Sequence, residues 1–381
     1  MARKTNTTIN GTNYFRVTAT VGKDSDGIPI RKQFYGESKK EAEAKRDEYM
    51  ENINKGLAVN YDKALFGVAF KTWFTEVLKP SISLSTYTRY EIDYRRRIAS
   101  CGISHMRLTD IRAANIQALY NTLLESNTPK TIRAIHKLLM QFFIYCVKAD
   151  IVIKNPLLAV ELPKVDYKST VNKAISDDDI NKLLKAVEEN ISNLVYVFAI
   201  FSGLREGEIL ALTKKDIDMD NETIHVNKSV KYLTVDKVYK PVISSTKTIN
   251  GVRTVPMLGA ITQYIQTYMQ HEEEKHNRMG IPFTKDSILF SSCVCTYRDS
   301  RSLLRMFNKL CTKLGIERVT VHSLRHTFCT ILAKQGVPLK TASILMGHSD
   351  IGITARIYTH VDDAEKRRGI EKLSTYFGQK N

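Results

Sequence analysis

The sequence lacks the features that mark several large classes of protein. Its longest apolar run, residues 194–201, is far too short to span a bilayer. The start, from Met1 to Thr5, has none of the apolar character of a signal peptide. Six cysteines are scattered along the chain without a Cys-x-x-Cys motif, so neither a disulfide framework nor a zinc ribbon is indicated. We therefore expect a soluble, cytoplasmic protein that does not contact a membrane.

Positive charge is what the sequence has in excess. The 381 residues carry a net charge of +17, and a chain of that length is expected to form two or three domains. Such an excess indicates a polyanionic partner, most commonly nucleic acid, although it could also serve solubility alone. The excess recurs in residues 1–40, 65–165 and 166–381. This distribution favours a protein that surrounds DNA over one with a single basic arm.

The first region, residues 1–62, is predicted to be a small α+β module. Residues 14–20 and 29–35 are rich in β-forming side chains and are separated by turn residues, and Ser38 can cap a helix that runs to Tyr49. A narrow two-stranded ribbon can enter a major groove. The candidate DNA-binding residues on this ribbon are Arg16, Arg31 and Lys32. The alternative is a hairpin with ordinary surface charges.

The second region, residues 65–162, is predicted to be an all-α domain. Phe66, Phe70, Trp73 and Phe74 fall at helical spacing and are expected to form a core rather than a stacking platform for bases. Helices are also expected to open at Ser85-Thr86 and to cover residues 114–124 and 129–149. The further candidates for DNA binding in this region are Arg95, Arg96 and Arg97. These three cannot share one helical face, so part of the triplet is expected to be merely solvated.

Residues 163–170 are polar and aperiodic and are interpreted as a linker to the third region, residues 171–381. Ser176 is a strong N-cap, and a second apolar helix is expected to end near Gly203. Residues 223–226, 238–244 and 252–255 are predicted strands. We expect the last two to form a hairpin with Lys247 at its tip, within a mainly helical α+β domain.

Several short segments of the third region could carry chemistry, although each has an ordinary explanation when taken alone. Arg205 follows the glycine that ends a helix, and Glu208 stands three residues later, where it could hold the arginine. A surface ion pair would explain this segment equally well. Lys247 could equally be a solvated residue of a turn.

The other two segments lie near the C-terminal end of the sequence. His322 and Arg325 fall one helical turn apart. His322 and His326 have the spacing of a metal pair, but Ser323 stands where zinc proteases have glutamate, so we expect no metal. His348 in a Gly-His pair precedes Tyr358 by ten residues, at the end of a short helix that Ser349 is expected to cap; an ordinary half-buried tyrosine is the alternative.

The combination is far more specific than its parts. The order arginine, lysine, His-x-x-Arg, Gly-His and tyrosine resembles the active site of the tyrosine recombinases, also called the phage integrase family. The resemblance covers the third region, and the second resembles the family's core-binding domain. The first resembles the arm-binding domain of integrases from Gram-positive phages and conjugative transposons. Residues 212–216 depart from the family pattern, because many relatives have a tryptophan in this segment.

The resemblance implies a role for each matching residue. Arg205 and Arg325 would be the catalytic arginines, with Glu208 in support, and Tyr358 would be the nucleophile. Lys247 would be the general acid, His322 would accept the tyrosine proton, and His348 would donate a hydrogen bond to the phosphate. The residues of the implied catalytic set are Arg205, Lys247, His322, Arg325, His348 and Tyr358.

These residue types suit the cleavage of a phosphodiester. Its negative charge repels nucleophiles, and planar guanidinium groups can neutralise that charge in the transition state. A phosphotyrosyl bond would conserve the energy of the broken bond, so rejoining would need no ATP, metal or other cofactor. The sequence contains neither a Walker motif nor a carboxylate metal cluster, which agrees with this expectation.

The resemblance therefore implies a site-specific recombinase that integrates and excises a mobile element through a 3′-phosphotyrosyl intermediate and a Holliday junction. The implied partners are double-stranded DNA at attachment sites or transposon ends, other copies of the chain in a tetramer, and possible accessory proteins, namely an excisionase and a host DNA-bending protein. Two alternatives stay open: an enzyme like a type IB topoisomerase, and a non-catalytic DNA-binding regulator.

Overall fold

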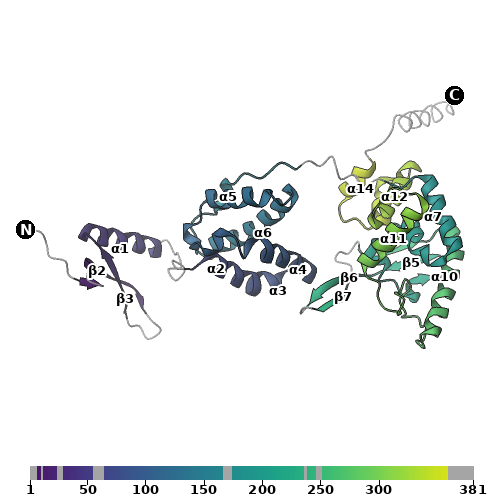
Figure 1. Cartoon of the computed structure of the whole chain (residues 1–381), viewed down its shortest axis with the longest axis horizontal. Coiled ribbons are helices and arrows are strands. Elements are labelled where there is room, and N and C mark those ends of the chain that lie inside the picture. Colours follow the sequence, from purple (N-terminus) through teal and green to yellow (C-terminus); the bar gives the residue numbers. More distant parts are fainter. Residues whose placement is uncertain are drawn as a thin grey trace, which may run out of the picture. The chain divides into compact units, whose positions relative to one another are not determined.

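The computed structural model describes residues 7–9, 12–23, 29–54, 64–165, 174–235, 238–245 and 251–358. Contacts within the chain divide it into two compact units, residues 1–167 and 168–381. Figure 1 shows the elements of each unit, and each is described by itself below.

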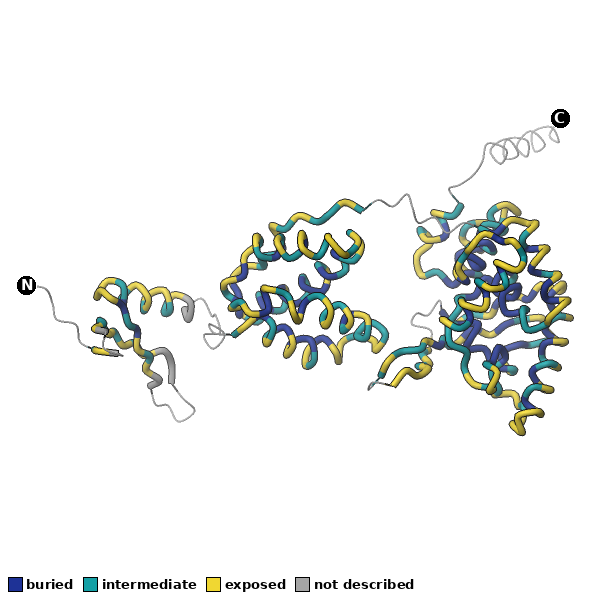
Figure 2. The backbone as a smooth tube through the Cα atoms, viewed as in Figure 1, coloured by how far each residue is buried: buried dark blue, intermediate teal, exposed yellow. Residues whose placement is uncertain are grey.

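The first unit begins with a three-stranded antiparallel sheet in the order β1-β2-β3 (Figure 1). The strands are followed by one helix, and the bounds are β1 Thr7–Ile9, β2 Thr12–Lys23, β3 Pro29–Gly36 and α1 Lys39–Asn54. The helix contacts β2 and β3. Phe34 and Ala42 are buried between these elements, while most of the other described side chains are exposed or half-buried (Figure 2). The predicted strands and helix are confirmed. Of the predicted turn residues 23–27, Lys23 ends β2 and residues 24–27 lie outside the described residues.

The sheet separates the three basic residues predicted to contact DNA. Arg16 and Arg31 are both exposed. Arg31 pairs with Thr20, which lies on the same face of β2 as Arg16 because side chains alternate along a strand. Lys32 pairs with Ala19 and lies on the opposite face, where its ammonium group sits 3.7 Å from the ring centroid of Tyr49 in α1. The sheet therefore presents Arg16 and Arg31 on one face and Lys32 on the other.

Residues 64–165 form a helical bundle around an aromatic core (Figure 2). Its main helices are α2 Phe66–Thr72, α3 Lys79–Ser81, α4 Leu84–Asp93, α5 Ala113–Leu124 and α6 Pro129–Lys148. Two π-helical turns, Trp73–Leu78 and Tyr94–Ile98, continue α2 and α4. The four aromatic residues at helical spacing are buried, as predicted. Helix α4 begins at Leu84, one residue before the predicted opening at Ser85-Thr86, and the side chain of Ser83 caps it by accepting from the Thr86 amide.

The arginine triplet of this bundle divides into two kinds. Arg95 and Arg96 are exposed. Arg97 is drawn inward: its Nη1 lies 2.6 Å from Asp93 Oδ1, and its Nε donates to Asn127 Oδ1 at 2.9 Å. Arg97 therefore ties the end of α4 to the loop before α6, which leaves it less able than its neighbours to contact a partner.

The second unit combines seven longer helices and one short one with small sheets, among its described residues. The helices are α7 Asp177–Glu189, α8 Leu194–Ser202, α9 Glu206–Ile209, α10 Gly259–Arg278, α11 Ser300–Leu314, α12 Val321–Lys334, α13 Leu339–Met346 and α14 Ile351–Tyr358. The strands are β4 Ile217–Asp218, β5 Thr223–Val226, β6 Lys228–Val235, β7 Val238–Ser245 and β8 Arg253–Pro256. The core gathers around α8, which is buried along nearly its whole length.

The predicted hairpin in this unit was wrong. Strand β7 pairs with β6, which the sequence analysis did not predict, and β8 pairs with β5 in a sheet of order β4-β5-β8. Val230 is the only residue of β6 that is fully buried. The strand therefore lacks the alternation of apolar and polar side chains by which a strand is predicted from sequence. Lys247 lies between β7 and β8, outside the described residues.

The turn after α8 brings two distant parts of the sequence together. Gly203 ends α8 with a φ of +61°, a conformation that favours glycine. A Cβ atom at this position would lie 2.1 Å from the Phe328 ring of α12, which packs beside α8. Glycine therefore allows the segment after α8 to approach the N-terminal half of α12.

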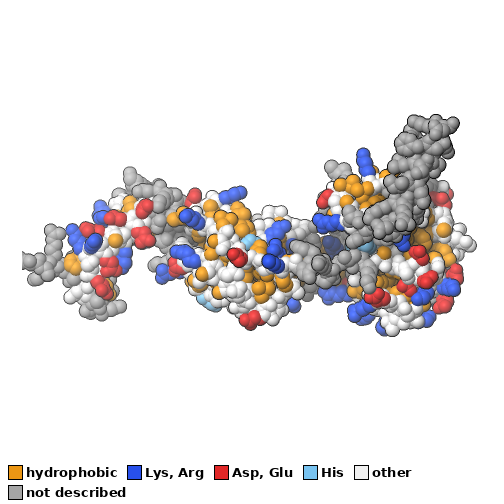
Figure 3. All heavy atoms as spheres, turned by 90° about the horizontal axis from the view of Figure 1, so that it is seen from above, with side chains coloured by type: hydrophobic (Ala, Val, Ile, Leu, Met, Phe, Trp, Pro, Cys, Tyr) orange, Lys and Arg blue, Asp and Glu red, His pale blue; other side chains and the backbone are white. Residues whose placement is uncertain are grey.

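The surface agrees with the spread of charge along the sequence. In the view of Figure 3, Lys and Arg side chains lie over all three parts of the chain, with acidic side chains among them. Among the described residues, no helix combines the length and apolar character needed to cross a membrane.

Replacing Gly203 with alanine should destabilise the second unit strongly. The left-handed backbone costs about 1–2 kcal/mol for a non-glycine residue, and overlap with Phe328 should raise the loss to roughly 3 kcal/mol or more. Gly315→Ala is the matched control, because Gly315 also ends a helix with a φ of +64° but has open space around its Cβ position. Chemical unfolding should give a clearly larger loss for Gly203→Ala; equal losses would show that close packing at Gly203 is unimportant.

Candidate active site

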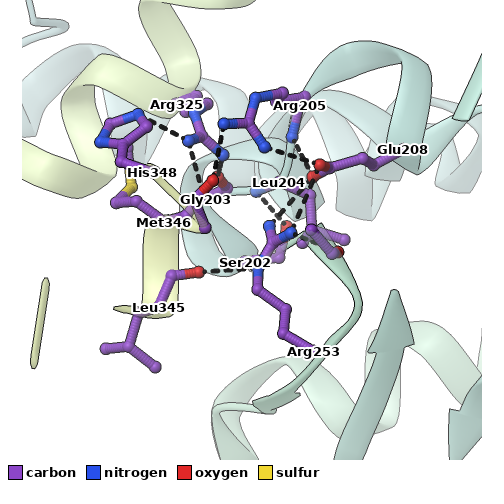
Figure 4. A network of polar contacts seen from close by, with 12 residues as sticks. Ser202, Gly203, Leu204, Arg205, Glu208, Arg253, Arg325, Leu345, Met346 and His348 are labelled. Carbon is purple, nitrogen blue, oxygen red and sulfur yellow. Dashed lines mark hydrogen bonds and ion pairs between the residues drawn. The ribbon is translucent and has the colours of Figure 1, made fainter. Parts of the chain in front are cut away.

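The candidate site is built on the C-terminal end of α13. The last carbonyl groups of a helix have no partner within the helix and form its negative pole. Here three successive carbonyls each accept from a different arginine: Leu345 from Arg253, Met346 from Arg325, and Gly347 from Arg205. Figure 4 shows how these guanidinium groups converge from separate elements. Three cations that are far apart in the sequence therefore meet at one helix end.

Arg205 lies in the turn between α8 and α9. Its Nη1 donates to Glu208 Oε1 at 2.8 Å, and its backbone amide donates to Glu208 Oε2 at 2.9 Å. Its Nη2 donates to the Gly347 carbonyl at 2.7 Å. The contact with Glu208 is the one that the sequence spacing predicted. The Arg205 side chain is 43% exposed, so its remaining donors can meet a ligand from solvent.

Arg325 lies one turn into α12 and is only 2% exposed. Its Nη1 donates to the Gly203 carbonyl, and its Nη2 donates to both the Met346 carbonyl and His348. Burial, together with the charge of the neighbouring Arg205, lowers the pKa of Arg325 to about 9, while Glu208 opposes the shift. The guanidinium nevertheless stays charged at neutral pH.

His348 is a hydrogen-bond acceptor in this arrangement. Arginine has no acceptor atom, so the 2.8 Å contact from Arg325 Nη2 fixes His348 Nε2 as unprotonated. The ring proton then lies on Nδ1 and donates to the buried Thr354 hydroxyl of α14 at 2.8 Å. Burial and the nearby arginines lower the pKa of His348 to about 4. This geometry differs from the expectation that His348 donates to a phosphate.

His322 stands at the start of α12, one turn before Arg325, as predicted. Partial burial of its ring lowers its pKa, and the charges of Arg325 and Arg205 lower it further. His322 also influences the pKa of His348, so both imidazole rings belong to the same electrostatic cluster. The ring is therefore neutral at neutral pH and can accept a proton.

Tyr358 ends α14 and is not held in the arginine network. Its hydroxyl donates to the Val337 carbonyl, between α12 and α13, at 3.1 Å. Burial raises the pKa of Tyr358 to about 12, with a smaller contribution from Cys329. The predicted cap of this helix was wrong: the Asp350 carboxylate, not Ser349, accepts from the Gly352 amide at 2.8 Å. The structure therefore brings Arg205, Arg325, His322 and His348 together. The Tyr358 phenol stays protonated and is hydrogen-bonded elsewhere, to the Val337 carbonyl.

Two residues of the network were missed by the sequence analysis. Arg253 opens β8 and contacts Glu208. Its segment, residues 252–256, has the form usual in the family that the sequence resembles, but that pattern assigned the arginine no role. Thr354 lies four residues before Tyr358, and only the fold reveals its bond to His348. Lys247, predicted to belong to the site, lies outside the described residues.

The described residues contain no group of three His, Cys, Asp or Glu side chains placed to hold a metal ion. His326, the possible metal partner of His322, instead contacts Thr330. The arrangement can therefore offer a compact set of cationic N–H donors to an anion with several oxygens, such as a phosphate diester. The neutral His322 lies on the same helix as Arg325, and Tyr358 ends α14, which contacts that helix.

Comparison with known proteins agrees with this chemistry. Residues 173–365 match the phage integrase family, and residues 65–124 match its N-terminal SAM-like domain. A XerC-like tyrosine recombinase of Caldanaerobacter subterraneus is 34% identical over 99% of this chain and 100% of its own length. The ICEBs1 integrase of Bacillus subtilis is 26% identical over 71% of this chain and 70% of its own length.

Solved structures show the same fold. The Tn1549 transposon integrase in complex with transposon right end DNA aligns with a TM-score of 0.67 and 23% identity, over 80% of this chain and 99% of that one. A lambda integrase tetramer bound to a Holliday junction aligns with a TM-score of 0.56 and 16% identity, over 89% and 93% of the two chains. Given the family match over half of the sequence and the relative that covers nearly all of it, this chain belongs to the phage integrase family and is a tyrosine recombinase.

Proposed function

We propose that this recombinase integrates and excises a mobile element by bonding Tyr358 to a 3′ phosphate of DNA. The observation that carries the proposal is the pair of guanidinium groups, Arg205 and Arg325, held together at the C-terminal end of α13. Such a pair can bind the nonbridging oxygens of one phosphate and stabilise the charge that develops as the tyrosine attacks.

Tyr358 must move before it can react. Its hydroxyl is bonded to a carbonyl and its pKa is raised to about 12, so the phenol is protonated and a poor nucleophile in this arrangement. Approach to the arginine pair would favour the phenolate, because nearby positive charge stabilises it. His322 is the proposed acceptor of the phenol proton, and Lys247 is the proposed acid that protonates the 5′ oxygen of the leaving strand.

His348 is proposed to orient Arg325 rather than to contact the phosphate in the resting arrangement. Its Nε2 accepts from Arg325, and its Nδ1 bonds to Thr354 on the helix that carries Tyr358. The imidazole thus links the cationic site to the nucleophile's helix. Donation from Nε2 to a phosphate would first require this bond to break.

The assembly is also a proposal. Residues 1–62 would bind arm-type DNA sites, residues 65–162 would bind the core site, and residues 171–381 would cleave it. Four protomers would exchange strands through a Holliday junction, helped by an excisionase and a host DNA-bending protein. The DNA bound by the Tn1549 integrase and the Holliday junction bound by the lambda integrase tetramer support two of these partners, namely DNA and other copies of the chain.

A nicked suicide substrate tests the central reaction. The wild-type chain should form a covalent adduct on a denaturing gel, because a short strand downstream of the cleavage site diffuses away and prevents rejoining. Label at the 5′ end of the cleaved strand should stay with the protein, and the released fragment should carry a 5′ hydroxyl. Tyr358→Phe should bind the DNA equally well and form no adduct. An adduct with Tyr358→Phe, or label retained from the 3′ end, would contradict the proposal.

The pH dependence of cleavage tests His322. Its pKa lies below 6.5, so the neutral, proton-accepting ring dominates above that pH and is lost as the pH falls through the lowered pKa. The single-turnover rate of the wild type should therefore hold down to pH 6.5 and fall below it. His322→Gln should cleave ~10²-fold more slowly and lack this fall. An unchanged acidic fall in His322→Gln would assign it to another group.

Removal of the C-terminal residues tests the proposed assembly. We expect residues 365–381, which lie outside the described residues, to dock on a neighbouring protomer. A chain that ends at residue 364 should bind one DNA site normally but form fewer complexes with two sites, as measured by native gel or analytical ultracentrifugation. Unchanged assembly of paired sites would remove this role for the tail.

A further inference from the structure

We propose that Arg253 is a positioning residue for DNA cleavage, which holds Glu208 and the C-terminal end of α13 so that Arg205 faces the phosphate. The proposal rests on the function proposed above and assigns a role to a residue outside the catalytic set. Arg253 touches none of the reacting groups, so it would act only through the residues that it holds.

Arg253 makes a two-pronged contact with the Glu208 carboxylate. Its Nη2 lies 2.9 Å from Oε2, and its Nη1 lies 3.3 Å from Oε1. The two side chains are only 7% and 3% exposed. The planar fork of arginine matches the two oxygens of a carboxylate, and lysine cannot reproduce this geometry. Arg253 therefore fixes the orientation of the carboxylate as well as its charge.

Glu208 passes this orientation to Arg205. Each oxygen that contacts Arg253 also accepts from Arg205, one from the side chain and the other from the backbone amide. Burial would raise the pKa of Glu208, but the bond and charge of Arg253 outweigh it, with further help from Arg205, so the pKa lies below its usual value. Without Arg253, a buried carboxylate would depend on the half-exposed Arg205 alone and would gain a proton more readily.

The same guanidinium supports the end of α13. Its Nε donates to the Leu345 carbonyl at 3.1 Å, next to the carbonyls that hold Arg325 and Arg205. It also packs against the backbone of Gly347, where a Cβ atom would lie 2.7 Å from Arg253 Nη1. Gly347 has a φ of +63°, and its own carbonyl accepts from Arg205. Arg253 thus contacts both groups that fix Arg205, namely Glu208 (Figure 4) and the backbone of Gly347.

The position of Arg253 in the sequence adds a third connection. It is the first residue of β8, and its Nη1 also contacts the Gly251 carbonyl at 3.4 Å. Strand β8 follows the segment that contains Lys247, the proposed general acid. The anchor that holds Arg205 is therefore also the point at which the chain returns to the sheet after that lysine.

The test compares full-length variants on the nicked suicide substrate, with DNA affinity measured separately. Arg253→Met should reduce the single-turnover cleavage rate by roughly 100-fold, as expected when a catalytic group is slightly misplaced, while the affinity for DNA stays close to that of the wild type. Arg253→Lys keeps the charge but loses the fork, so it should recover part of the rate. A wild-type rate for either variant would overturn the proposal.

Lys275→Met is the matched control for loss of a buried ion pair. Lys275 bonds to Glu272 in α10 with side chains 14% and 1% exposed, and α10 carries none of the proposed catalytic residues. This variant should lower the thermal midpoint yet cleave at the wild-type rate. If Lys275→Met and Arg253→Lys lose stability and cleavage in equal measure, Arg253 has only a structural role.

Two further measurements distinguish positioning from general damage. Arg253→Met added to Glu208→Gln should slow cleavage far less than it does in the wild type, because the carboxylate through which it acts is already gone. In the His322→Gln background, which lacks the fall assigned to His322, adding Arg253→Lys should produce an acidic fall in rate at a higher pH than His322→Gln alone shows, because Glu208 loses its strongest support. Additive losses and an unshifted pH profile would overturn the proposal. Failure of the wild type to form any adduct would instead refute the proposed function.

Discussion

The repulsion between like charges is the constraint around which this site is built. Two unit charges about 4 Å apart repel by roughly 4 kcal/mol at the effective dielectric constant of a protein surface, and here three guanidinium groups converge on one helix end. Burial is the largest cause of the lowered pKa values of Arg325, His322 and His348, and repulsion from the neighbouring arginines lowers all three further. A cluster of arginines that is ready for a phosphate before DNA arrives must therefore include groups that offset the repulsion.

Two groups offset this repulsion: the carbonyls at the end of α13 and the carboxylate of Glu208. The end of α13 has carbonyls that its own helix cannot satisfy, and the arginines satisfy them. Glu208 supplies a buried negative charge, shared between Arg205 and Arg253. The glycines at positions 203 and 347 permit the close approach, because each lets a backbone pass where a Cβ atom would meet a side chain. The cluster is thus a property of backbone geometry as much as of charged side chains.

The sequence predicted the residues of this site better than it predicted their connections. Arg205, His322, Arg325 and His348 lie in short motifs whose spacing is local, so they could be found without knowing the fold. By contrast, the contacts made by β8 join segments that are far apart in the sequence. Strand β8 pairs with β5 across at least 27 residues, and Arg253 contacts Glu208 across 45 residues, so no local pattern encodes either contact. The contact of Lys32 with Tyr49 was not predictable for a related reason, because only the strand register places the two side chains together. Residue type and periodicity indicate which elements form, but the direction of a side chain depends on what packs against it.

The separation of Tyr358 from the arginines follows from the same electrostatics. A phenol kept beside three cations would tend to ionise and occupy the place of the phosphate. Hydrogen-bonded to the Val337 carbonyl, the phenol stays protonated and does not occupy the place of the phosphate. One such hydrogen bond contributes only about 0.5–1.5 kcal/mol, so a well-formed DNA interface can readily offset its loss. The hydrogen bond between His348 and Thr354 connects the arginine cluster with α14. Movement of the tyrosine helix should therefore disturb Arg325, which ties activation of the nucleophile to the state of the phosphate site.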